Sequence, residues 1–123
     1  MITIAFLLRR LPDLDEAEFH RYWREEHAPL VASHREALGI RRYEQLHSLE
    51  PAMSEALRAT RGCEATRYDG VALVSFDSLE ALGEATASAQ GIAAGAALLA
   101  DERRFLDLER CVIWFNDTNV VIG

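Results

Sequence analysis

Residues 2 to 8, ITIAFLL, form an unbroken apolar run near the start of the chain. A short apolar run that begins with β-branched side chains predicts a strand buried on both faces. Successive side chains of a strand point to opposite faces of its sheet, so Ile4 and Phe6 share one face while Ala5 and Leu7 share the other. Both faces of the sheet that contains this strand must therefore be covered.

A helical region follows the first strand. Asp15 is a good N-cap, and Glu18 stands three residues later, at the spacing of a capping box. Pro29 disfavours a helical residue before it and has no N–H to donate, so we expect the first helix to stop or kink near Glu26. A second helix should begin at Pro29 and end at Gly39.

Three more strands and a second helical region are expected further along the chain. The strands are predicted at residues 40–49, 71–77 and 111–115. Residues 51–69 form a less regular insertion, with a possible short helix in PAMSEALRAT and then a loop. Ser78 can cap a helix after the third strand, and the small-residue stretch up to Leu99 should also be helical.

The resulting order is strand, helix, strand, strand, helix, strand. This is the ferredoxin-like βαββαβ order of an α+β domain, with a four-stranded antiparallel sheet and both helical regions on one face. Residues 1–123 are expected to form a single domain. A second copy of the chain is the simplest cover for the other face, so we expect a symmetric homodimer, and the apolar VVI of the tail could join the partner's sheet.

Composition excludes several classes of function. The net charge of -7 and the lack of a basic stripe argue against nucleic-acid binding. No apolar run reaches the roughly 18 residues of a membrane span, and no secretory leader is recognisable, so we expect a soluble cytoplasmic protein without a membrane partner. Cys63 and Cys111 form no CxxC pair, and His20, His27 and His34 recur at seven-residue steps, about 10.5 Å apart on a helix. A metal site is therefore not expected.

The segment EFHRYWREEHAPLV, followed by GIRRYEQLH, resembles the EthD-like family, which is named for a protein of ether degradation. The later segment DERRFLDLERCVIWF resembles the closing part of that family. The resemblance implies ferredoxin-like subunits that pair into a dimeric α+β barrel and generally work without metal or organic cofactor. It also implies relatives that include lactone isomerases of aromatic catabolism and decarboxylases or cyclases of polyketide pathways.

Two histidines are candidate catalytic residues. His27 lies on the apolar face of the first helix and matches the histidine of the family's HxPL motif, although it could simply cap free helix carbonyls. His47 shares one face of the second predicted strand with Tyr43 and Gln45. In a dimeric barrel this face could line the interior cavity, where Tyr43 and Gln45 would bind and orient substrate; alternatively, it lies under the helices or in water.

Apolar and aromatic walls for the same cavity are expected from the first and last strands. Phe6 and Leu8 share one face of the first strand, and Trp114 and Asn116 share one face of the last, though each could be ordinary core. The leading hypothesis is a cofactor-independent enzyme that acts on a small cyclic or aromatic oxygenated compound by general acid–base chemistry. A non-catalytic binding or accessory protein with the same cavity is the alternative, and a stress or assembly protein is a third.

Overall fold

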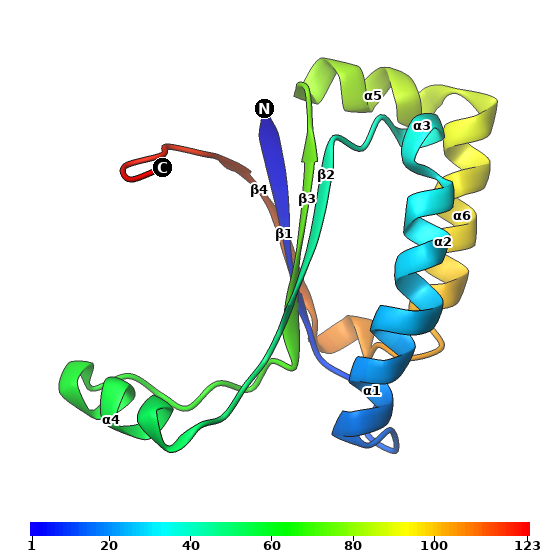
Figure 1. The fold of residues 1–123 in the computed structure, drawn as a ribbon. Helices are drawn as coiled ribbons and strands as arrows, with labels where there is room; N and C mark the ends of the chain where they lie inside the picture. Colours follow the sequence, from blue (N-terminus) through cyan, green and yellow to red (C-terminus); the bar gives the residue numbers. More distant parts are fainter.

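The computed structural model describes residues 1–123, and its centre is one four-stranded antiparallel sheet with the strand order β2-β3-β1-β4 (Figure 1). The ferredoxin-like prediction is confirmed, because β1 pairs with β3 and β4, and β2 pairs with β3, all antiparallel. The strands are β1 (Ile2–Leu8), β2 (Arg42–His47), β3 (Gly70–Phe76) and β4 (Val112–Asp117).

Two helical segments cover the same face of the sheet (Figure 1). The first is the series α1, η1, α2 and α3, and the second comprises α5 and α6. Their bounds are α1 (Glu16–Tyr22), the π-helical turn η1 (Trp23–His27), α2 (Ala28–Ser33), α3 (Arg35–Leu38), α5 (Leu79–Ala87) and α6 (Ala89–Glu102). The short 3-10 turn η2 (Leu108–Arg110) leads into β4.

The capping predictions hold at two helix starts. The Asp15 side chain accepts a 2.7 Å hydrogen bond from the Glu18 N–H, and Ser78 accepts one from Ala81 at the start of α5. Gly39 ends α3 with a positive φ of 70°, a conformation that glycine adopts at little cost.

The stop or kink predicted near Glu26 is present, in the form of a π turn that separates α1 from α2. The helical backbone continues from α1 into α2, but it widens to a π turn in which the Ala28 N–H bonds the carbonyl of Trp23. Pro29 occupies the first turn of α2, where the missing N–H needs no partner from within that helix. The α-helix is therefore interrupted before Pro29 by a wider turn, and Pro29 stands in the first turn of the next helix, as the sequence predicted.

The core lies between the sheet and the helices, in two clusters. One cluster is built around the fully buried side chains of Leu8, Phe19, Trp23 and Phe105. The other joins α2, α3 and α6 to the end of β3 through Val31, Leu38, Ile40, Phe76 and Ala94. These contacts fix the distance between the helices and the sheet.

The opposite face of the sheet is not covered by any helix of the same chain (Figure 1). By strand register, this open face carries Ala5, Leu7, Leu73 and Trp114, and Trp114 is 45% exposed. Helix α4 (Ala52–Arg61), which matches the predicted short helix of the insertion, and the tail after β4 both extend on this side of the sheet (Figure 1). The tail's Val120, Val121 and Ile122 form no strand and are exposed.

Replacing Gly70 by alanine should destabilise the fold. The new Cβ would lie 2.5 Å from Cζ3 of Trp23 and 2.9 Å from the carbonyl oxygen of Leu46. We expect a loss of about 1–3 kcal/mol in the free energy of unfolding, measured by urea denaturation, because the core would be overpacked. Gly95→Ala is the matched control, since nothing lies within 4 Å of its new Cβ and alanine favours a helix interior. Equal stability of the two variants would contradict close packing of Trp23 on β3.

Candidate functional site in the helix–sheet cavity

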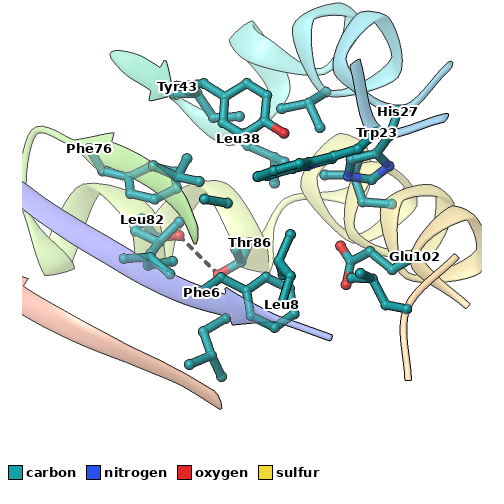
Figure 2. A pocket seen from close by; sticks show the side chains of 18 of the residues that line it. Phe6, Leu8, Trp23, His27, Leu38, Tyr43, Phe76, Leu82, Thr86 and Glu102 are labelled. Atoms are coloured by element: carbon teal, nitrogen blue, oxygen red, sulfur yellow. Dashed lines mark hydrogen bonds between the residues drawn. The ribbon is translucent and has the colours of Figure 1, made fainter. Parts of the chain in front are cut away.

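A cavity of about 320 Å³ lies between the sheet and the two helical segments that cover it. Sixteen of its 19 lining residues are hydrophobic, and the other three are His27, Thr86 and Glu102. Figure 2 shows His27 and Glu102 at one end of this helix–sheet cavity and Phe76 and Leu82 toward the other. Predominantly apolar cavities with a few polar groups are typical of small-molecule sites.

Four of the predicted site residues line this cavity. Phe6 and Leu8 form part of its sheet wall, Tyr43 lies on β2, and His27 projects from the π turn (Figure 2). The cavity lies within one chain, under the helices. Strand register places Tyr43 on the same side as Val74 and Ile4, so it faces the helices. This is one of the alternatives that the sequence left open for this face, and the location inside a dimeric barrel is corrected.

Trp114 and Asn116 are not brought to the cavity. They pair with Ala5 and Thr3 of β1, so they lie on the open face of the sheet. The Trp114 indole N–H donates to Asn116 Oδ1 at 2.7 Å, and the Asn116 amide donates to the Thr3 carbonyl at 3.1 Å. Their predicted role as walls of the same cavity is corrected for this reason; Ile113, one residue earlier, points to the helix side and lines the cavity.

His27 is held by the carboxylate of Asp101, which belongs to α6. Its Nδ1 lies 2.7 Å from Oδ2 of Asp101, and the Tyr22 hydroxyl donates to Oδ1 of the same carboxylate at 2.6 Å. The His27 side chain is buried. Because Asp101 requires a donor, Nδ1 carries the proton, which leaves the lone pair of Nε2 available. Burial lowers the pKa of His27 below 6.5, while the hydrogen bond and charge of Asp101 act in the opposite direction.

Glu102 was not predicted as a site residue. It ends α6, next to Asp101, and lines the cavity. Burial and the neighbouring Asp101 charge raise the pKa of Glu102 to about 7. The sequence held one signal for it, because Glu102 stands four residues after Leu98 and so shares the apolar face of α6. A carboxyl group on the apolar face of a helix is unusual enough to mark a candidate site residue.

His47 lies outside the cavity. Trp23 lines the cavity and packs against His47 with ring centroids 4.4 Å apart, so the indole separates this imidazole from the interior. Burial, the charge of Arg24 and neighbouring His20 lower the pKa of His47 to about 4. His47 therefore remains neutral near pH 7.

Gln45 connects His47 to the one polar group of β2 that reaches the cavity. His47 Nε2 lies 2.8 Å from Gln45 Oε1, and Gln45 Nε2 donates to the Trp23 carbonyl at 2.9 Å and to the Tyr43 hydroxyl oxygen at 3.0 Å. The His20 and His47 Nδ1 atoms are 2.7 Å apart, so His20 supplies the donor if His47 donates to Gln45.

The direction of these hydrogen bonds determines whether the Tyr43 hydroxyl can act as a donor in the cavity. Since Gln45 donates to the Tyr43 oxygen, the hydroxyl hydrogen of Tyr43 is free for another acceptor. Burial raises the pKa of Tyr43, so the hydroxyl keeps its proton at neutral pH. Tyr43 lines the cavity and can donate to an oxygen of a bound molecule.

No group of three or more His, Cys, Asp and Glu side chains is arranged as a metal-binding cluster. Neither cysteine is in a disulfide; Cys63 is exposed and Cys111 is partly buried. None of the helices is both long enough and apolar enough to cross a bilayer.

The fold and site define a ferredoxin-like α+β domain with a histidine and a carboxyl group in one apolar cavity. The family model described as the EthD domain matches residues 11–109. The chain therefore belongs to the EthD family, as the resemblance of the segment around His27 predicted.

Solved structures show the same fold. An EthD family protein from Bacillus halodurans is 18% identical with a TM-score of 0.62, covering 97% of this chain and 100% of that chain. An EthD-like protein from Ralstonia eutropha is 16% identical with a TM-score of 0.61, covering 99% and 96%. SnoaB, a cofactor-independent oxygenase from Streptomyces nogalater, is 14% identical with a TM-score of 0.50, covering 98% and 93%. No curated protein sequence matches this chain.

Replacing Glu102 by glutamine should make the protein more stable at alkaline pH. The folded-state pKa of about 7 lies above the unfolded value of 4.5, so stability falls as the pH rises from 4.5 and the loss is complete above about 7. Glu102→Gln removes this loss. We expect its free energy of unfolding to exceed that of the native protein by ~2 kcal/mol at pH 8 and by much less near pH 4.5.

Urea denaturation across this pH range measures the difference. Glu84→Gln on the exposed surface of α5 is the matched control and should follow the native curve. A Glu102→Gln curve parallel to the native curve at every pH would show that Glu102 titrates normally.

Proposed function

We propose that this chain is a cofactor-independent enzyme that acts on a small cyclic or aromatic oxygenated compound by general acid–base chemistry, of the isomerase, decarboxylase, cyclase or dehydratase type. The observation that carries the proposal is the presence of His27 and Glu102 in one otherwise apolar cavity of about 320 Å³. The class of metabolism, catabolic or polyketide-like, rests on the family resemblance. The cofactor-independent oxygenase among the structures of the same fold is compatible with such a cavity.

His27 is the general base of the proposed reaction. Its lowered pKa keeps the imidazole neutral at pH 7, and the Asp101 hydrogen bond holds Nδ1 protonated, so Nε2 can take a proton from substrate. The positive charge that develops on the ring is then stabilised by the Asp101 carboxylate.

Glu102 is the general acid. With a pKa of about 7 it is still about half protonated at pH 7, so it can donate a proton to an oxygen or carbon of the substrate. Tyr43 would hydrogen-bond another substrate oxygen and orient it, while Phe6 and Leu8 contact its apolar part. Gln45 and His47 act indirectly, by directing the Tyr43 hydroxyl.

A non-catalytic binding or accessory protein is the second candidate. Sixteen hydrophobic lining residues could hold an apolar ligand without chemistry. A carrier needs the apolar wall but not the acid–base pair. The carrier would be favoured if the native protein and its His27 variants bound the ligand with the same affinity and none of them turned it over.

The proposed subunit is part of a homodimer. The open face of the sheet carries Leu73 and the half-exposed Trp114, and β1 adds Leu7, so leaving this face in water is unfavourable. Helix α4 and the tail lie on the same side of the sheet (Figure 1), and their exposed apolar residues, such as Met53 and Ile122, could extend the contact. A second copy would cover all of these surfaces by two-fold symmetry.

Replacing His27 by asparagine should abolish most of the activity. We propose screening bicyclic aromatic ketones for base-catalysed deuterium exchange next to the carbonyl in D₂O, followed by NMR. Removal of a general base is expected to lower kcat by roughly 10²- to 10⁴-fold. The native rate should rise as His27 becomes neutral below pH 6.5 and fall as Glu102 ionises near pH 7.

His34→Asn is the control for this experiment, because His34 lies outside the cavity at the end of α2. It should exchange at the native rate. If folded His27→Asn exchanges deuterium at the native rate, His27 is not the base. If the exchange rate of Glu102→Gln still falls above pH 7, Glu102 is not the acid.

Replacing Trp114 by arginine should disrupt the dimer, since a cation would be buried in an apolar contact. Light scattering should give the native protein twice the 13.8 kDa mass of one chain. Trp114→Arg should approach one chain mass at low concentration. Ile92→Arg, at an exposed position of the helical layer, is the control and should remain dimeric. A native mass of 13.8 kDa would contradict the proposal.

A further inference from the structure

A second, strongly basic pocket lies at the end of the sheet. Four arginines line it, together with one carboxylate, and this arginine pocket has a volume of about 250 Å³. Its lining residues are Arg9, Arg10, Leu11, Pro12, Arg67, Asp69 and Arg110. Such a concentration of cations is unexpected in a chain with a net charge of -7.

Sheet topology brings these arginines together. β1 runs antiparallel to both of its neighbours, so its last residues lie beside the first residues of β3 and β4. Arg9 and Arg10 directly follow β1. Arg67 shortly precedes β3, and Arg110 ends the η2 turn just before β4. Four cations from three separate segments therefore meet at one edge.

The carboxylate in the pocket balances only one of these charges. The Arg10 guanidinium forms an ion pair with Asp69, its backbone N–H donates to Asp69 Oδ2 at 2.9 Å, and its Nε donates to the Leu14 carbonyl. Arg9, Arg67 and Arg110 form no ion pair within the chain. Three cationic side chains thus remain available to an anion.

One polar atom of the pocket lacks a partner altogether. Nε of Arg9 is buried without a hydrogen bond, and the guanidinium carbon lies 4.9 Å from the centre of the Tyr68 ring. A buried donor without an acceptor is unfavourable, and stacking on an aromatic ring restricts the orientation of the guanidinium. Arg9 is therefore held in place with unsatisfied hydrogen-bonding capacity.

We propose that the arginine pocket binds a compact, multiply charged oxyanion, with a phosphate group as the best match. Guanidinium groups present paired N–H donors that fit the oxygens of phosphate, and three uncompensated charges suit a ligand that carries at least two negative charges. A concave pocket of about 250 Å³ accommodates a small anion better than it accommodates the flat acidic surface of a protein. This binding is separate from the proposed acid–base chemistry, because none of the four arginines lines the helix–sheet cavity.

Calorimetric titration with inorganic pyrophosphate tests the proposal at constant ionic strength. We expect saturable binding that the double variant Arg67→Gln/Arg110→Gln weakens by about tenfold or more, since charge-assisted hydrogen bonds are lost. Both side chains are exposed, so the variant should fold, as circular dichroism would confirm. Arg61→Gln, which removes one positive charge from the end of α4, should bind pyrophosphate as tightly as the native protein.

Other anions define the specificity of the pocket. Phosphate and pyrophosphate should bind more tightly than succinate or acetate at the same ionic strength. Absence of saturable pyrophosphate binding would overturn the proposal, as would equal weakening in Arg61→Gln, which would indicate general charge screening. A change of oligomeric mass in Arg67→Gln/Arg110→Gln without anion binding would assign the arginines to a protein contact instead.

Discussion

The site depends on the hydrogen bonds that the Asp101 carboxylate accepts. Asp101 lies on α6, and its two donors, Tyr22 and His27, lie on α1 and the π turn, so these bonds join the two helical segments. The π turn presents His27 toward this carboxylate, and the end of α6 presents Glu102 into the same cavity. Burial then moves the two pKa values in opposite directions, lowering that of His27 and raising that of Glu102. The usual order of proton affinity for a carboxyl group and an imidazole is thereby brought to near equality or reversed.

Most of the fold could be predicted because its determinants are local. The apolar run of β1, the cap at Asp15, and the order of strands and helices are all visible in short windows of sequence. Pro29 predicted an interruption near Glu26 but not its form, because the backbone there is a π turn in which Trp23 and His27 are buried. Tertiary contacts decided that segment, and they are not visible in its sequence alone.

The site was harder to predict than the fold. Alternation shows that Tyr43, Gln45 and His47 share a face, but it cannot show which face the helices cover. The first strand is apolar on both sides and gives no further indication. Whether His47 reaches the cavity depends on the position of the Trp23 ring, which packs over it. Glu102 was missed for a different reason: the predicted helix ended at Leu99, whereas α6 continues to Glu102 and places it on the same face as Leu98.

The raised pKa of Glu102 links occupancy of the cavity to proton uptake from solution. A neutral apolar ligand would displace water from around this carboxyl group and raise its pKa further above about 7. Near neutral pH each binding event would then withdraw a fraction of a proton from the buffer. The measured enthalpy of association would vary with the ionisation enthalpy of that buffer, while an ammonium-bearing ligand would reverse the direction of proton exchange.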